Sequence, residues 1–176
     1  MRSPNMQSLK VGATEFDRLS FTGSVLAPIS RSTTLRVLHL RNISIGKLHA
    51  GAISWTIKQS KTLRELVLSS CEIDDNVMDR IGLALGSLET LDLSGNQVGD
   101  KGVASIAQGL LTNTTLRKID LSGNENITNH GQAMIANMLH TNKTLQYVEL
   151  PSDTEASVDI HKQLTKNRKT DAAIAA

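Results

Sequence analysis

The chain contains 176 residues, of which 39% are hydrophobic, 2% are aromatic and 20% are charged, and its formal net charge is +2. The length allows one domain with a continuous core, but the shortage of aromatic side chains argues against a wide globular interior and favours a thin layer of Leu, Ile, Val, Met and Ala. The single cysteine excludes an internal disulfide bond, and residues 1–10 contain no long apolar run, so we expect a cytoplasmic protein with neither a signal peptide nor a membrane span.

Residues 1–34 are expected to form an N-terminal cap, or degenerate repeat. Phe16, Leu19 and Phe21 match the start of a strand pattern that recurs further along the chain. Only 19 residues separate Phe16 from the next such start at Leu35, which is too few for a strand followed by a full helix. We therefore expect Pro28 in a loop.

Five segments with a shared pattern, L-x-x-L-x-L with conservative changes, follow this cap. They begin at Leu35, Leu63, Leu88, Leu116 and Leu145, and the interval from Leu63 to Leu88 is the shortest. A nearly constant period in this range is typical of a stacked array, because each unit has an apolar face that only its neighbours cover. The sequence predicts repeats over 35–62, 63–87, 88–115, 116–144 and 145–168, and then a C-terminal tail over 169–176 that is frayed from Asp171.

Each repeat is expected to contribute one strand and one helix. Alternation of apolar positions, as in Leu91 and Leu93, indicates short strands that pair in parallel with the same strand of the next repeat. Parallel pairing needs a crossover, and the second half of each repeat has helical spacing, as in Val103 and Ile106. The second repeat, 63–87, is shorter than the repeats on either side of it, so its helix or its return loop should be trimmed by about one turn. Trp55 is expected in the buried stripe of the first helix.

The ninth position of each repeat is expected to form a polar ladder between turns. In successive repeats it holds Ile43, Cys71, Asn96, Asn124 and Asp153. An asparagine there can bond backbone groups of its own turn and of the neighbouring turn, which compensates polar groups buried between repeats. Cys71 would do this weakly, and we interpret it as a buried structural residue. Ile43 cannot, so the first turn should differ, whereas Asn113 is expected in an exposed loop of little consequence.

These residues resemble leucine-rich repeats of the ribonuclease-inhibitor-like class. The resemblance rests on LETLDLSGNQVGDKGVASIAQGLLTNTTLRKIDLSGN from Leu88, on LQYVEL from Leu145, and on the room for a full helix in each of the longer repeats. The ending LTKNRKT from Leu164 resembles the closing helix of tropomodulin-like repeat arrays. The resemblance implies an α/β fold: a short right-handed solenoid with a parallel sheet on its concave face and helices on its convex face.

No set of residues has catalytic or metal-binding spacing. The histidines are His39, His49, His130, His140 and His161, and their spacing is not that of a ligand set. Gly95 and Gly123 occur in repeated LSGN turns, without the lysine of a phosphate-binding loop. We therefore expect no enzyme activity, no metal and no cofactor.

A binding site is expected on the concave face of the sheet, where the outward-facing positions vary. The residues best placed to contact a partner are Arg36, His39, Arg41, Glu65, Asp92, Lys118, Asp120, Tyr147 and Glu149. Asp92, Asp120 and Glu149 would stand in one row on neighbouring strands, where like charges repel. This row is either a docking stripe for a basic partner or solvated surface that nearby Lys and Arg balance. Tyr147, the only tyrosine, is a candidate aromatic anchor.

Charge is ordered along the chain, with a net charge of +7 over residues 1–70, −8 over 71–161 and +3 over 162–176. In a stacked array, sequence order is also axial order, so this pattern gives a basic end, an acidic middle and a basic tip. Chance drift of surface charge explains the pattern equally well.

We predict a non-enzymatic protein-interaction module or scaffold, because a rigid sheet with varied polar residues and no catalytic cluster is suited to holding another protein. One alternative is a regulator of a GTPase or other enzyme, similar to the Ran GTPase-activating proteins that share this repeat type. Another is nucleic-acid binding through the basic segment 1–70 and the tail, which the acidic middle and the lack of aromatic residues oppose. The identity of the partner and the association of two copies remain open.

Overall fold

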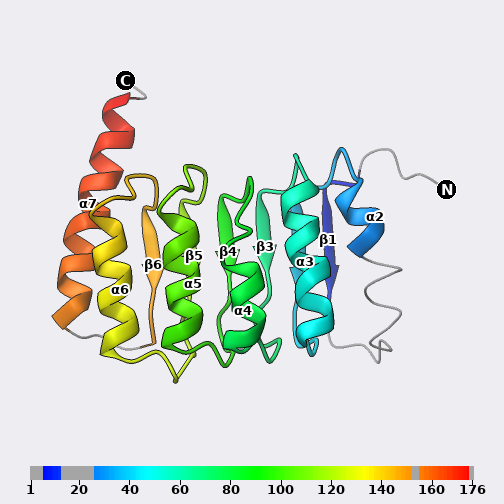
Figure 1. The fold of residues 1–176 in the computed structure, drawn as a ribbon. Coiled ribbons are helices and arrows are strands. Elements are labelled where there is room, and N and C mark those ends of the chain that lie inside the picture. The colour runs from blue at the N-terminus through cyan, green and yellow to red at the C-terminus, as the bar shows by residue number, and fades with distance from the viewer. Residues whose placement is uncertain (1–5, 13–25, 152–154, 175–176) are drawn as a thin grey trace.

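The computed structural model describes residues 6–12, 26–151 and 155–174, which form one open sheet of parallel strands with helices side by side along one face (Figure 1). The strands, in their order across the sheet, are β1 (Ser8–Val11), β2 (Val37–Leu40), β3 (Glu65–Val67), β4 (Thr90–Asp92), β5 (Lys118–Asp120) and β6 (Tyr147–Glu149). The helices are α2 (Ala27–Ser30), α3 (Lys47–Gln59), α4 (Asp75–Ile81), α5 (Asp100–Leu110), α6 (Asn129–Leu139) and α7 (Glu155–Ile174).

Neighbouring strands pair at equivalent positions of successive repeats. Leu66 lies beside Leu91, and Leu91 lies beside Ile119. These side chains belong to the buried core, whose hydrophobic members among the described residues are Leu, Ile, Val, Ala, Met and Cys. The predicted α/β class and the parallel strand pairing are therefore confirmed.

Helix α4 is shorter than its neighbours, as the short second repeat predicts. It has seven residues, whereas α3 has 13 and α5 has 11. Its end lies close against α5, because a Cβ built on Gly109 would overlap the carbonyl oxygen of Gly82. Only a residue without a side chain allows this approach, so the two glycines hold the end of α4 against α5.

The N-terminal part of the sheet differs from the expectation. The strand beside β2 is β1, in which Ser8 pairs with Val37, and residues 16–21 lie outside the described residues. Pro28 belongs to α2 and not to a loop. Proline is tolerated in the first turn of a helix, where its missing N–H has no intrahelical partner.

Trp55 was expected in the core, but it is 48% exposed. The buried hydrophobic side chains described in α3 are Ala50, Ile53 and Ile57, which follow one side of the helix. Trp55 lies two positions from Ile53 and Ile57 and is therefore turned away from that side. The prediction was wrong because it included Trp55 in the buried face of the helix, which is narrower than expected.

The closing helix α7 covers the C-terminal end of the stack and continues to Ile174, so residues 171–174, the described part of the tail expected to fray, are helical (Figure 1). The Asp171 carboxylate accepts hydrogen bonds from Arg117 at 2.6 Å and from the Gln146 side chain at 2.8 Å. These bonds tie the last turns of α7 to the segments that enter β5 and β6. Within the described residues, no helix combines the length and hydrophobicity needed to cross a membrane.

Asn96 and Asn124 bond backbone groups of two adjacent turns. The Nδ2 of Asn124 donates to the carbonyl oxygen of Leu121 at 2.9 Å and to that of Leu93, in the preceding repeat, at 3.0 Å. Its Oδ1 accepts the N–H of Val98 at 3.0 Å. Asn96 makes corresponding bonds one repeat earlier, and both amides are buried. Each asparagine thus satisfies backbone groups that water does not reach.

Cys71 occupies the same position as these asparagines. Its Sγ lies 3.2 Å from the carbonyl oxygen of Leu40, the group that corresponds to the acceptors of Asn96 and Asn124 in the preceding repeats. The thiol is buried, and this burial raises its pKa, so the group stays protonated and donates. The next ladder position, Asp153, lies outside the described residues.

The first turn was expected to differ because Ile43 cannot join the ladder, but its backbone follows the other turns. Asn42 has φ of 55°, in the left-handed region, as do Ser70 with φ of 55° and Gly95 with φ of 65° at the same repeat position. The N–H of Asn42 donates to the carbonyl oxygen of Ser69, and the N–H of Ser70 donates to that of Ser94, so both bonds run to the seventh residue of the next repeat. The turn conformation therefore does not depend on a polar side chain at the ladder position.

A second set of asparagine contacts, which was not predicted, joins the turns after α5 and α6 to each other and to α7. Asn142 donates to the carbonyl oxygens of Leu110 at 2.7 Å and Asn113 at 3.0 Å. Asn113 itself accepts the N–H of Leu116 at 2.8 Å, and Asn167 of α7 donates to the carbonyl oxygen of Asn142 at 3.1 Å. Asn113 is thus part of a bonded turn, contrary to the expectation of an inconsequential loop.

Two helices are capped by a carboxylate from the preceding repeat. Asp75, at the start of α4, accepts the N–H of Gly102 in α5 at 2.9 Å. Asp100, at the start of α5, accepts the N–H groups of Thr128 at 2.9 Å and Gly131 at 3.1 Å, where α6 begins. Burial acts to raise the pKa of Asp100, but the hydrogen bonds from Thr128 and Gly131 outweigh it and lower this pKa. A negative charge at a helix N-terminus is also stabilised by the helix dipole.

Candidate functional site

The sheet face opposite the helices, named here the exposed sheet face, carries the residues predicted to bind a partner. Two rows of side chains cross it at the spacing of neighbouring strands, about 5 Å. The first row holds Ser8, Val37, Glu65, Thr90, Lys118 and Tyr147. The second row holds Lys10, His39, Val67, Asp92, Asp120 and Glu149.

Two carboxylates of the second row bond their own turns. Oδ1 of Asp92 accepts the N–H of Ser94 at 2.9 Å and its hydroxyl at 2.7 Å. Oδ1 of Asp120 accepts the N–H of Ser122 at 3.0 Å and its hydroxyl at 2.7 Å. Each pair of bonds stabilises the turn after the strand and offsets repulsion within the row. The hydrogen bonds of Asp92 and Asp120 therefore stabilise the turns, whereas their negative charge is available to a partner.

Lys118, Tyr147 and Glu149, named here the Tyr147 cluster, lie together on β5 and β6. The Nζ of Lys118 lies 4.7 Å from the centroid of the Tyr147 ring, within the range of a cation–π contact. The Tyr147 hydroxyl donates to the Glu149 carboxylate, and this bond raises the pKa of Tyr147. The ring is 40% exposed, so it presents an aromatic surface between a cation and an anion.

The other predicted residues lie on β2 and β3. His39 Nε2 lies 2.7 Å from Glu65 Oε1. Val67 of β3, which lies between His39 and Asp92 in the second row, is only 4% exposed. Arg36 and Arg41 lie directly before and after β2, with exposed side chains. The structure therefore does not gather the predicted residues at one point: β4 separates this group from the Tyr147 cluster.

Two ion pairs at the edge where the strands begin were not predicted. Arg64 Nε lies 3.3 Å from Glu89 Oε1, and Arg117 Nη1 lies 2.6 Å from Asp171 Oδ2. Arg64, Glu89 and Arg117 all occupy the second position of their repeats. A comparison of that position across repeats would have indicated the first pair, because adjacent strands bring equivalent positions together.

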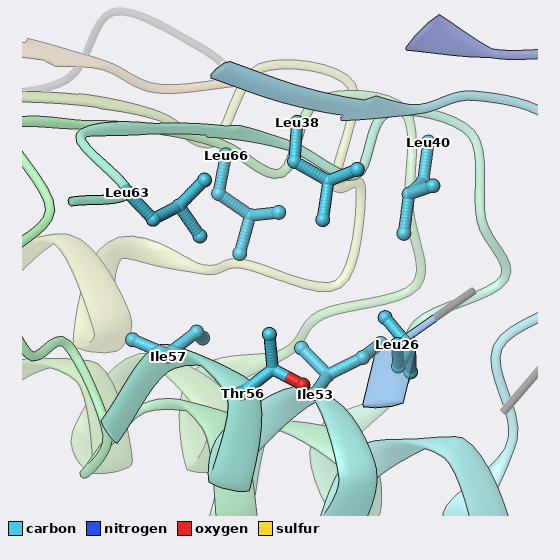
Figure 2. A pocket seen from close by; sticks show the side chains of 8 residues that line it. All are labelled: Leu26, Leu38, Leu40, Ile53, Thr56, Ile57, Leu63 and Leu66. Atoms are coloured by element: carbon cyan, nitrogen blue, oxygen red, sulfur yellow. The ribbon is translucent and has the colours of Figure 1, made fainter. Parts of the chain in front are cut away.

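The described residues contain no group of three His, Cys, Asp or Glu side chains that could hold a metal ion. Figure 2 shows an apolar cavity between the sheet and α3, lined by residues that include Leu38, Leu66 and Ile53. The cavity has no room for a water molecule, and the Thr56 hydroxyl beside it donates to the carbonyl oxygen of Ala52 at 2.8 Å. This cavity is a gap in the packing and not a ligand site.

Comparison with known proteins places these features in context. A family model described as Leucine Rich repeat matches residues 59–76, 87–107 and 112–136. Protein TORNADO 1 of Arabidopsis thaliana is 30% identical over 168 residues, which cover 85% of this chain and 12% of that protein. Capping protein, Arp2/3 and myosin-I linker protein 2 of Mus musculus is 32% identical over 108 residues, which cover 56% of this chain and 8% of that protein. Ribonuclease inhibitor of Sus scrofa is 33% identical over 94 residues, which cover 51% of this chain and 21% of that protein.

The chain thus spans only 8% to 21% of the length of these relatives. Among solved structures, leiomodin-1 actin-binding site 2 matches with a TM-score of 0.73 and 17% identity, covering 98% of this chain and 87% of that one. At this identity the similarity concerns the fold.

Proposed function

This chain is a leucine-rich repeat protein of the ribonuclease-inhibitor-like class, and we propose that it is a non-enzymatic interaction module that holds a protein partner on its exposed sheet face. The proposal is carried by the Tyr147 cluster. An exposed tyrosine ring held between Lys118 and Glu149 offers apolar area and two charges on a rigid sheet. Tyrosine is enriched among the residues that dominate protein interfaces.

The names of two similar proteins support a protein as the class of partner. The mouse protein is named as a linker of capping protein, Arp2/3 and myosin-I, and the leiomodin segment is named as an actin-binding site. Both names describe contacts between proteins. The acidic part of the second row, Asp92, Asp120 and Glu149, further favours a basic surface on the partner.

An affinity pull-down with the full chain tests this function. We expect Tyr147→Ala combined with Lys118→Ala to lose specific partners that the unchanged chain retains, because both substitutions remove the central contact area. The matched control is Lys101→Ala combined with Gln108→Ala, two exposed positions on α5. If both double variants retain the same proteins, the exposed sheet face is not the binding site. Circular dichroism of each variant verifies that the fold is kept.

Once a partner is identified, its association rate tests the acidic row. The variant Asp92→Asn, Asp120→Asn, Glu149→Gln removes the charges while the amide oxygens still accept from Ser94 and Ser122. We expect slower association at low salt, and a smaller difference at about 0.5 M salt, where the Debye length is about 4 Å. An unchanged rate at low salt would show that the row is solvated surface only.

A further inference from the structure

The helical face of the molecule carries a groove of about 380 Å³ between α3 and α4. Its lining includes Trp55 and Lys58 of α3 and Arg80 of α4, with Leu83 just after α4. The groove lies where the repeat is short: α4 has seven residues, and its end at Gly82 packs closely against α5. The short repeat and this close glycine contact together accompany the groove.

Two large apolar side chains are exposed in this groove. Trp55 is 48% exposed and Leu83 is 55% exposed. Apolar side chains that gather in a hollow on an otherwise polar surface are typical of an interaction site. Tryptophan is also among the residues that contribute most to binding at protein interfaces.

The groove carries two positive side chains and one negative side chain. Lys58 and Arg80 are exposed, and neither has an ion pair or side-chain hydrogen bond to any of the residues that the structure describes. The one carboxylate of the lining, Asp79, accepts the hydroxyl of Ser105 at 3.0 Å and is thus engaged with α5. A ligand in the groove would meet two unpaired cations, two apolar side chains and one carboxylate that is hydrogen-bonded to Ser105 of α5.

We propose that this groove binds an acidic peptide segment of a partner protein, with one apolar side chain of the segment against Trp55 and Leu83 and its carboxylates near Lys58 and Arg80. Charge complementarity favours a segment with Asp or Glu on both sides of the apolar residue. The recessed shape and the small apolar area fit one anchoring side chain and not the broad apolar face that membrane binding uses. This site lies on the opposite side of the sheet from the Tyr147 cluster and is independent of the proposed function.

The single tryptophan makes the groove directly observable. Because Trp55 is the only tryptophan in the chain, its fluorescence reports this site alone. The full chain is titrated with short synthetic peptides in which Leu or Phe lies between Glu residues. Control peptides carry Lys in place of Glu, or Ser in place of the apolar residue. We expect a saturable blue shift of the emission with the acidic apolar peptides and none with the controls.

Variants assign the binding to the groove by calorimetry. Lys58→Glu combined with Arg80→Glu should weaken the acidic peptide by about tenfold or more, and Leu83→Ser should also weaken it. Lys101→Glu and Leu111→Ser, matched exposed positions in and just after α5, should change the affinity by less than about twofold. Tyr147→Ala should leave it unchanged, which separates this site from the exposed sheet face.

Four results would overturn the proposal. The first is the absence of a saturable shift with every acidic apolar peptide, and the second is equal binding of the Lys peptides. The third is a Trp55 emission that shifts with protein concentration and not with peptide, together with dimers in analytical ultracentrifugation. That result would make the groove an interface between two copies of the chain. The fourth is a shift that anionic phospholipid vesicles produce and the peptides do not.

Discussion

The carboxylate of Asp100 accepts the backbone N–H of Gly131 at 3.1 Å, so the first residue of α5 caps the next helix of the stack. A Cβ on Gly131 would overlap the same carboxylate oxygen, and the absence of a side chain there makes room for the bond. Asp75 and Gly102 repeat this relationship one repeat earlier, with a bond of 2.9 Å and a Cβ distance of 2.7 Å. Helix capping in this protein is therefore a contact between repeats as well as within them.

The substitution Asp100→Asn should lower the free energy of unfolding by about 1 kcal/mol at pH 7, because it removes the charge at the N-terminus of α6. The pKa of Asp100 is lowered below 3.8 in the folded chain, so its stabilisation is present above about pH 4 and is lost as the pH falls through the lowered pKa. The difference between the two chains in urea unfolding should therefore shrink at acidic pH. Asp159→Asn, an exposed position on α7, is the control. A difference that stays constant with pH would contradict a role for the charge.

Two glycines inside helices should respond to alanine with opposite signs. Alanine usually stabilises a helix interior relative to glycine by about 1 kcal/mol. Gly51 in α3 has no atom within 4 Å of an added Cβ, so Gly51→Ala should raise the thermal midpoint. Gly109→Ala would drive its Cβ into the Gly82 carbonyl oxygen and should cost about 1–3 kcal/mol. If both variants are stabilised, α4 and α5 do not approach as closely as described.

The ladder should contribute measurably to stability. Asn124→Leu removes the partners of buried backbone groups and should cost about 1–3 kcal/mol in urea unfolding. Asn137→Leu changes an exposed residue of α6 and should cost less than about 0.5 kcal/mol. Similar losses in the two variants would argue against the ladder. Asn113 is unsuitable as a control, because it bonds the N–H of Leu116.

The Tyr147 hydroxyl should ionise at a pH above its ordinary pKa of 10.0, because ionisation breaks its bond to Glu149 and creates a second negative charge beside that carboxylate. Glu149→Gln should move the pKa back toward 10.0. Absorbance in the near ultraviolet, where tyrosinate absorbs, measures this directly, since Tyr147 is the only tyrosine. Equal midpoints in the two chains would show that the Tyr147 cluster does not form in solution, provided that circular dichroism stays constant over the titration.

The repeated elements were predictable because the same pattern recurs at a nearly fixed interval. Leu91 and Leu93 indicate a strand only weakly by themselves, but the period places β2 to β6 in register and gives each a crossover helix. The short second repeat even indicated the short α4. The strand β1 was missed, because its sequence SLKV carries only two apolar side chains and is not followed by a complete repeat.

Features that depend on detailed contact geometry were not predictable in the same way. The exposure of Trp55 depends on which side of α3 faces the sheet, and a stripe of apolar residues defines that side only within about one residue. The bonds of Asp92 and Asp120 to Ser94 and Ser122 were missed, because those carboxylates were considered only as neighbours across strands. The groove beside Trp55 adjoins a close glycine contact between α4 and α5, and sequence spacing alone does not reveal such a contact.

The capping of α5 by Asp75 and of α6 by Asp100 always runs from an earlier repeat to a later one. In both cases the carboxylate precedes the helix that it caps, so during synthesis each cap leaves the ribosome before its helix does. We expect such a chain to add repeats in order of translation, with every completed unit preparing the start of the next. A circular permutation that opens the chain between Asp100 and α6 would reverse this order for one helix, so that α6 would be synthesised before the carboxylate that caps it.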